Sequence, residues 1–179
     1  KKALFYNDMS GFRSRVSKIA KTKGNSFIRY IFNKLLNNLY SSLANFAPIG
    51  SLRIYFHRKR GVRIGKNVSL PSGLALERAF PEYIVIEDEV AFGPGVKVIT
   101  HSIPPISFNR VVLPHVSPVI FKKGSWIGAY SIILPGCTIG NNSLVSAGSV
   151  VSSDVPDNCI VAGNPAEIIK TFKPRRKKS

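Results

Sequence analysis

The sequence predicts an all-β domain coiled from six-residue repeats, with a helical segment before it and a basic tail after it. The main observation is a run of six consecutive hexads from Phe121 to Pro156. The first residue of every hexad is large and apolar: Phe121, Ile127, Ile133, Ile139, Val145 and Val151. The fifth residue is small or β-branched: Ser125, Ser131, Cys137, Ser143, Ser149 and Val155. A period sustained over this length indicates a repeat architecture.

The six-residue period matches neither an α-helix nor a lone strand, whose apolar residues recur at three- to four-residue and two-residue steps. It matches a short β-segment followed by a turn, with one bulky side chain per repeat pointing inward. Three such segments make a coil of about eighteen residues, so six hexads build two coils of a β-helix. A small fifth residue fits beside a bulky first residue in a narrow prism. Cys137 is therefore expected to pack in the core rather than to react.

The repeat extends towards the N-terminus with two interruptions. Hexads begin at Ile64 and Leu70, the register breaks through residues 76–83, and the pattern resumes from Ile86 to Val98. Residues 102–118 then carry no hexads and are rich in proline. A long non-repeating stretch in a compact domain is typical of a functional loop. The predicted β-helix domain spans 61–169, with this loop at 102–118.

Residues 1–60 form a separate basic and helical segment. Apolar residues recur at helical spacing over 25–46, Asn25 and Ser26 are suited to capping the start, and Pro48 and Gly50 end the pattern. Two interpretations stay open for this helix. It packs against its own β-helix or a neighbouring subunit, or it lies on a membrane surface with Arg29 and Lys34 beside its apolar face.

The charge is concentrated at the two ends of the chain. The formal net charge is +17, of which residues 1–60 carry +12 and the tail 170–179 carries +6, while 61–169 carry −1. Basic ends suit an anionic membrane surface, an anionic cofactor or nucleic acid. The neutral β-helix and the lack of an aromatic-basic pattern argue against nucleic acid.

Compartment and membrane topology follow from the cysteines and the hydropathy. The two cysteines, Cys137 and Cys159, form no metal motif, which favours a reducing compartment. No signal peptide is recognised, and no apolar run approaches the roughly 20 residues needed to span a bilayer. A cytoplasmic location, with contact at the inner face of a membrane, is therefore expected.

His101 is the candidate catalytic residue. It stands where the regular coil meets the long loop, so one side is held while the other is open to substrate. The reference pKa of histidine, near 6.5, suits a general base at neutral pH. His57 is expected on the surface within a charged run, and His115 is expected in the loop without a catalytic role.

Three groups of motifs carry a resemblance to a known family. The first is Val-Ile-Thr-His, which ends at His101. The second is Ser-Trp-Ile-Gly at 125–128 with Leu-Pro-Gly-Cys-Thr-Ile-Gly at 134–140. The third consists of residues 147–151, residues 155–158 and Ala-Gly-Asn-Pro-Ala at 162–166. Over residues 60–172 the chain resembles the maltose/galactoside O-acetyltransferase branch of the hexapeptide-repeat acyltransferases. The resemblance implies a left-handed parallel β-helix, a hand that the period alone does not fix.

The resemblance also implies a mechanism. His101 takes the proton from an acceptor hydroxyl, whose oxygen attacks the thioester of acetyl-CoA directly while backbone N–H groups stabilise the oxyanion. Glu82, an acid on the irregular coil, is the candidate partner that orients His101. Asn109 and Arg110, in the loop, are candidate contacts to the acceptor, and Glu82 is a further candidate for binding it.

The acyl donor is expected in the groove between two subunits of a homotrimer, as in that family. Trp126, Gly128, Ala129 and Ala147 match the stretches that line the pantetheine arm; the alternative for Trp126 is packing. Near the phosphate end of the cofactor the family often has Thr-Lys and two later basic residues, and the matching candidate positions here are Ser152, Ser153, Glu167 and Lys170. The lysine is lost, and one of the two basic residues is an acid. Lys170 and the basic tail are the candidates to replace the missing contacts.

These observations predict transfer of an acetyl group from acetyl-CoA to a sugar hydroxyl, in the assembly of surface polysaccharide, lipopolysaccharide or capsule. The alternative enzyme on the same scaffold is an N-acyltransferase for a nucleotide-linked amino sugar. A γ-class carbonic anhydrase needs three histidines around zinc, and the three histidines here lack the close pair of that class. A non-enzymatic scaffold is the remaining alternative.

Overall fold

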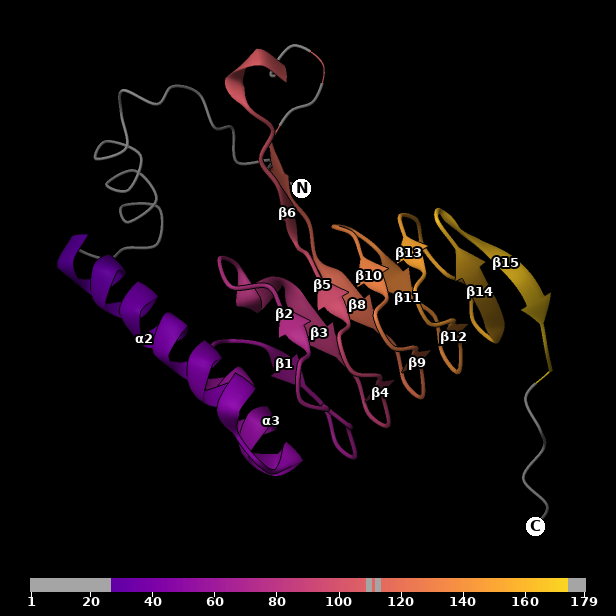
Figure 1. Cartoon of the computed structure of the whole chain (residues 1–179), viewed down its shortest axis with the longest axis horizontal. Helices are drawn as coiled ribbons and strands as arrows, with labels where there is room; N and C mark the ends of the chain where they lie inside the picture. Colours follow the sequence, from indigo (N-terminus) through magenta and orange to yellow (C-terminus); the bar gives the residue numbers. More distant parts are fainter. Residues whose placement is uncertain (1–26, 109–110, 112–113, 174–179) are drawn as a thin grey trace.

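The computed structural model describes residues 27–108, 111 and 114–173. The described part begins with helix α2 (Phe27–Phe46), which is followed by helix α3 (Gly50–Lys59) and then by a stack of β-coils (Figure 1). The helix predicted over 25–46 is confirmed as α2. The basic run at 51–60, for which no separate helix was predicted, forms most of α3, which packs against α2. Among the described residues, no helix is both long and apolar enough to cross a bilayer.

Three parallel sheets form the faces of the stack. Face A contains β1 (Arg63–Ile64), β3 (Ile84–Ile86), β8 (Val119–Phe121) and β11 (Thr138–Ile139). Face B contains β4 (Ala91–Phe92), β9 (Trp126–Ile127), β12 (Leu144–Val145) and β14 (Cys159–Gly163). Face C contains β2 (Ala75–Leu76), β5 (Lys97–Val98), β10 (Ile132–Ile133) and β13 (Val150–Val151).

The chain visits the faces in the order A, B, C and repeats it. Consecutive coils pair at equivalent positions, so Ile127 lies opposite Val145 and Ile133 lies opposite Val151. The two residues of each pair are eighteen residues apart in the sequence, which is one coil, as the hexads predicted. The parallel β-helix architecture is thus built by residue spacing: each hexad supplies one short strand and one corner.

The core is a column of the predicted inward side chains. The first residue of each of the six hexads from Phe121 is at most 1% exposed, and four fifth-position serines are equally buried. Cys137 and Cys159 are also buried and unpaired. Burial, with a smaller contribution from the charge of Asp154, raises the pKa of Cys137 to about 11. Its predicted role as a core residue rather than a reactive thiol is confirmed.

Helix α2 turns its small residues inward. Ser41 and Ala44 of α2, and Ala47 directly after the helix, are buried. The ring of Tyr40 stacks on that of Phe56 in α3, with centroids 6.2 Å apart. The large apolar side chains point outward and are exposed: Ile31, Phe32, Leu35, Leu39, Leu43 and Phe46. The predicted packing of α2 on its own chain therefore holds for one narrow stripe. Among the described residues, the side chains of the wide apolar face are exposed.

Both interruptions of the repeat fall at the same corner of the prism, between faces C and A. The first is residues 77–83, which follow β2 and include the 3-10 turn η2 (Pro81–Tyr83). The second follows β5, one coil later, and its base is a two-stranded ribbon of β6 (His101–Ser102) and β7 (His115–Val116). The predicted loop 102–118 is thus a projecting hairpin, with the 3-10 turn η3 (Ile106–Phe108) along it (Figure 1).

At the far end of the stack, the chain reverses. Strand β15 (Ala166–Thr171) pairs antiparallel with β14 and covers the last strand of face B. The tail was predicted to begin at residue 170, but Lys170 and Thr171 belong to this strand. Residues 174–179 of the predicted tail, and residues 1–26 of the predicted segment 1–60, lie outside the described residues.

Candidate active site

His101 contacts a carboxylate from the coil below it. Its Nδ1 lies 2.6 Å from Oε2 of Glu77. The ladder explains the contact: Leu76 lies opposite Val98, so the residues that leave β2 and β5 stack at the C–A corner. The base of the hairpin is closed where the Ser117 N–H donates to the Thr100 carbonyl at 2.9 Å. The paired strands β2 and β5 thus position the residues that follow them, Glu77 and His101.

The Glu77 carboxylate is enclosed and well supplied with donors. Its side chain is 7% exposed. The Ala79 N–H donates to Oε1 at 2.8 Å, and the Thr100 N–H donates to Oε2 at 3.3 Å. Burial by itself raises the pKa of Glu77, but these two bonds and the one from His101 outweigh it and hold the pKa below its usual value. Glu77 is therefore an anion at neutral pH.

An anionic acceptor at Nδ1 fixes the state of the imidazole. Because a carboxylate only accepts, Nδ1 of His101 carries the proton and donates it, and Nε2 of a neutral ring is left as a lone-pair acceptor. The ring is 29% exposed and meets the Phe80 ring edge-on, with centroids 5.7 Å apart. This oriented, partly open imidazole, backed by a carboxylate, is the arrangement of a general base.

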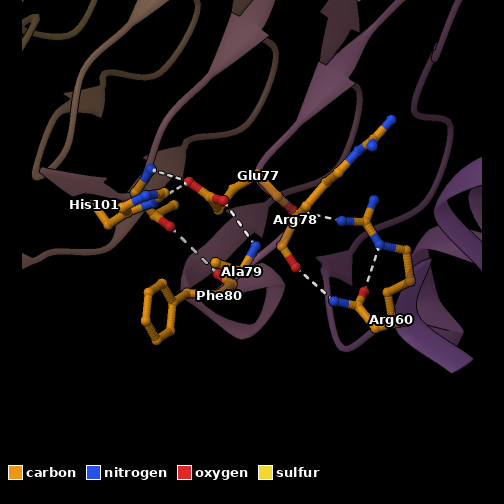
Figure 2. A network of polar contacts seen from close by, with 8 residues as sticks. Arg60, Glu77, Arg78, Ala79, Phe80 and His101 are labelled. Atoms are coloured by element: carbon orange, nitrogen blue, oxygen red, sulfur yellow. Dashed lines mark hydrogen bonds and ion pairs between the residues drawn. The ribbon is translucent and has the colours of Figure 1, made fainter. Parts of the chain in front are cut away.

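Glu82 was predicted to orient His101, and this was wrong: Glu77 has that place (Figure 2). Glu82 lies in η2, further along the irregular segment. The signal for Glu77 was present in the hexads. Leu76 and Val98 occupy the same position in successive coils, so the residue after Leu76 stacks near the residues after Val98.

The other two histidines have different environments. His57, predicted to be on the surface, is 3% exposed at the C-terminal end of α3. Burial lowers its pKa to about 4, with Arg60 and Arg53 adding to the effect. His115 lies opposite Ser102 in the ribbon, and neighbouring residues of a strand point to opposite faces. His115 and His101 therefore project from opposite faces of the hairpin base.

Four predicted donor-binding residues come together at the corner between faces B and C. Trp126 is 57% exposed on β9, so the alternative of core packing within this chain is wrong. Ala129 and Ala147 lie in stacked turns, where the Gly148 N–H donates to the Ala129 carbonyl at 2.8 Å. A Cβ on Gly128 would come within 2.5 Å of the Ala147 nitrogen, so glycine is needed there for the coils to stack.

The remaining predicted residues are spread over the molecule. Ser152 and Ser153 are exposed in the turn after β13, at the C–A corner, two coils from His101. Glu167 and Lys170 are exposed on β15, opposite Ala162 and Ile160. The structure brings neither pair next to Trp126 through any described contact. Asn109 and Arg110 lie outside the described residues.

Two residues of the site's surroundings were missed by the sequence analysis. Arg60, at the end of α3, and Asn37, in α2, both bond to the irregular segment that carries Glu77. A charged run and a polar helix position gave no sign of these contacts.

The coiled repeat is similar to that of known hexapeptide-repeat proteins. Residues 118–153 match the family model of the bacterial transferase hexapeptide (six repeats). The predicted resemblance to the maltose/galactoside O-acetyltransferase branch is confirmed by the relatives and solved structures that the chain matches.

Among curated relatives, the galactoside O-acetyltransferase of Lactococcus lactis is 34% identical over 143 residues, covering 79% of this chain and 64% of that protein. A shorter match, 46% over 57 residues, is to a 2,3,4,5-tetrahydropyridine-2,6-dicarboxylate N-acetyltransferase of Staphylococcus aureus, covering 32% of this chain and 24% of that one. The chain thus spans less than two thirds of the length of these relatives.

Solved structures agree on the fold. A hexapeptide-repeat-containing acetyltransferase from Vibrio cholerae superposes with a TM-score of 0.66 at 25% identity, covering 79% of this chain and 93% of that one. A maltose O-acetyltransferase from Clostridium difficile superposes with a TM-score of 0.60 at 26% identity, covering 80% and 86%.

Proposed function

We propose that this protein is an acetyl-CoA-dependent O-acetyltransferase that acts on a sugar hydroxyl, with His101 as its general base. The observation that carries the proposal is the contact between Nδ1 of His101 and Oε2 of Glu77, which leaves Nε2 able to accept a proton. The similarity to galactoside and maltose O-acetyltransferases supports a sugar acceptor. The left hand of the β-helix is part of the same proposal.

The reaction follows from the imidazole. Nε2 of His101 takes the proton of the acceptor hydroxyl while the hydroxyl oxygen attacks the carbonyl carbon of the acetyl thioester. The carbon–sulfur bond breaks, and the leaving thiolate takes the proton back from the imidazolium, so the enzyme is returned unchanged. Glu77 stabilises the imidazolium between these steps. No acyl-enzyme forms, and both cysteines are buried.

The acyl donor would lie across two copies of the chain in a homotrimer. Within one chain, His101 lies at the C–A corner and Trp126 lies on face B, so the two parts of the predicted site are at different edges of the prism. An exposed tryptophan beside the small residues at 128–129 and 147 fits a narrow pantetheine arm. A monomer in light scattering that retains full activity would rule this arrangement out.

The test of the proposed function is thiol release from acetyl-CoA by the wild type and by His101→Ala, with a panel of sugars, nucleotide sugars and amino sugars. We expect turnover with a sugar hydroxyl and a loss of about 10²- to 10⁴-fold in the variant. Turnover restricted to amino-sugar acceptors would favour the N-acetyltransferase alternative, which the Staphylococcus aureus relative supports. Equal activity of both proteins would remove His101 from the base role.

The acceptor's setting is proposed to be an anionic membrane surface that α2 contacts, at the inner face of the cell membrane during surface polysaccharide assembly. The outward face of α2 is apolar, with Leu35 62% exposed and Phe46 87% exposed. No acidic residue occurs between Asp8 and Glu77, so the whole segment around this face is cationic. Apolar area joined to positive charge is what an anionic bilayer surface attracts.

Co-sedimentation with vesicles tests this contact. The full chain should bind vesicles that contain phosphatidylglycerol and bind pure phosphatidylcholine vesicles at least about tenfold more weakly. Leu35→Glu combined with Leu39→Glu should abolish binding, while Asn38→Glu, at an exposed polar position of the same helix, should retain most of it. If the double variant instead changes the oligomeric state and vesicles are never bound, a second copy of the chain covers this face.

A further inference from the structure

The irregular segment that carries Glu77 is held on its far side by the helical segment. Nη2 of Arg60 donates to the Glu77 carbonyl at 2.5 Å, and Nδ2 of Asn37 donates to the Arg78 carbonyl at 2.5 Å. Nε of Arg60 donates to Oδ1 of Asn37 at 2.9 Å, which joins the two clamps. Figure 2 shows His101 on one side of this segment and Arg60 on the other.

These two carbonyls lie where the sheet no longer supplies partners. Strand β2 ends at Leu76, and the described residues resume parallel pairing only at β3, from Ile84. The bond to the Glu77 carbonyl is partly buried and the bond to the Arg78 carbonyl is exposed, so loss of the donor costs free energy mainly at Glu77, where the segment depends on Arg60. The position of the Glu77 backbone is therefore set by α2 and α3 as well as by the coil.

Arg60 is itself fixed from behind. It is 7% exposed, and its Nη1 lies 3.0 Å from Nδ1 of His57. The buried His57 is neutral at physiological pH, so its Nδ1 accepts from the guanidinium. Burial lowers the pKa of Arg60 to about 10, with Arg78 adding and Glu77 opposing, so Arg60 remains a cation at neutral pH. The Arg60 guanidinium is thus the donor that links Nδ1 of His57 to the Glu77 carbonyl.

We propose that Arg60 and Asn37 are positioning residues for the reaction, which hold the Glu77–Arg78 backbone so that the Glu77 carboxylate meets Nδ1 of His101. This inference rests on the proposed function, in which His101 is the base. The N-terminal helices then take part in orienting the catalytic pair, and are not only an attachment to the β-helix. Misplacing a base by about 1 Å costs up to about 10²-fold in rate.

A purely structural role for Arg60 is the competing explanation, and α3 offers a matched control. Arg53 is half-buried and donates to two backbone carbonyls, through Nε to Leu70 at 2.8 Å and through Nη1 to Ala47 at 2.6 Å. These bonds join α3 to the first coil and to the end of α2, away from Glu77. Arg53→Lys therefore removes comparable contacts without touching the catalytic pair.

The experiment compares Arg60→Lys with Arg53→Lys in the full chain, at matched stability in thermal melts. We expect kcat for thiol release to fall about 10- to 100-fold in Arg60→Lys, with KM for acetyl-CoA within about twofold, and to stay near wild type in Arg53→Lys. The downfield NMR resonance of the His101 Nδ1 proton, assigned by its absence from His101→Gln, should be lost or broadened only in Arg60→Lys.

Two results would overturn the positioning role. One is an unchanged kcat and Nδ1 resonance in a folded Arg60→Lys protein, and the other is an equal loss in both arginine variants. If Arg60→Lys does not fold, Asn37→Ala, which removes the bond to the Arg78 carbonyl from the half-buried face of α2, should lower kcat about 3- to 10-fold with the same effect on the resonance. A wild type without transferase activity would contradict the proposed function, while the resonance alone still decides whether Arg60 positions the pair.

Discussion

The coils from Phe121 onward follow the six-residue repeat without a break, whereas the two preceding coils interrupt it at the corner between faces C and A. In the regular coils, each inward residue is met by its own equivalent one coil away, as Ile127 meets Val145. At the corner, two departures from the repeat stack on one another and bring His101 onto Glu77. The repeat supplies a rigid frame, and the chemistry lies where two successive coils break the pattern at the same place.

The comparison also separates two kinds of polar group. The buried serine hydroxyls of the regular coils bond only to backbone groups of their own or the next coil, and that of Ser125 has no partner among the described residues. The polar groups of the corner form one connected set that runs from His57 through Arg60 and Glu77 to His101. A change in the first region should therefore alter stability alone, whereas a change in the second should alter activity.

The largest effect is expected for Ile139→Ala in the regular coils. Ile139 is fully buried on β11, so removing its side chain should lower the free energy of unfolding by about 2–5 kcal/mol. Chemical denaturation measures this loss. The kcat of the folded protein should stay near wild type, because no described contact joins Ile139 to the corner. A specific loss of kcat would contradict the division between frame and site.

Acid should weaken the protein through His57. Its pKa is about 4 in the folded protein and near 6.5 when unfolded, so the unfolded chain binds the proton more tightly. Stability is then fully present above pH 6.5 and falls by about 3 kcal/mol towards pH 4. Denaturation curves across this range measure the slope. In His57→Gln, whose amide oxygen keeps an acceptor for Arg60, the slope should decrease by about one proton; an unchanged slope would contradict the assignment.

Glu77→Gln should act on the rate rather than on the fold. The amide keeps the shape but lacks the charge that stabilises the imidazolium, and its NH₂ group opposes the N–H donors of Ala79 and Thr100. We expect kcat to fall about 10- to 100-fold, equivalent to about 1.4–2.7 kcal/mol. Glu82→Gln is the matched control and should change kcat less than about threefold. Steady-state kinetics that rank the two variants the other way would restore Glu82 as the partner.

The smallest effect distinguishes two serines at equivalent repeat positions. Oγ of Ser143 accepts from the Cys159 N–H at 3.1 Å, so Ser143→Ala should leave that donor unpaired and cost about 1–2 kcal/mol. Oγ of Ser125 is buried without a partner among the described residues, so Ser125→Ala should be neutral or slightly stabilising. Paired thermal melts measure the difference, and equal losses in both variants would show that burial of the hydroxyl, not its bonding, decides.

The regular part of the fold was predictable because the residues of each hexad are sufficient to indicate the local structure of that hexad. A bulky first residue and a small fifth one are enough to place a strand and a corner, and the same reasoning placed Cys137 in the core. Helix α2 was found from its spacing, whereas α3 was hidden in a charged run because the arginines that bond carbonyls there look like surface residues in the sequence.

The site was predictable only in part, because its partners come from different coils and helices. His101 stood out through its motif and its place beside a long loop. Glu77 required the pairing of Leu76 with Val98, which an irregular coil obscures unless the hexads are aligned across the break. Arg60 and Asn37 were out of reach, since the bonds to the Glu77–Arg78 carbonyls depend on how the helices lie against the coil and not on any local pattern.

The ends of the coil stack have a consequence for assembly. A β-helix ends in open strand edges, which are templates for adding another chain and hence for fibre growth. Here the first coil meets α3, whose Arg58 and Arg53 occupy the carbonyls of Ile64, Gly65 and Leu70. At the far end, the last strand of face B is covered by β15, which runs in the opposite direction and carries Glu167 and Lys170. The first coil and face B at the far end thus offer fewer free strand edges for coaxial addition, which favours assembly through the sides of the prism.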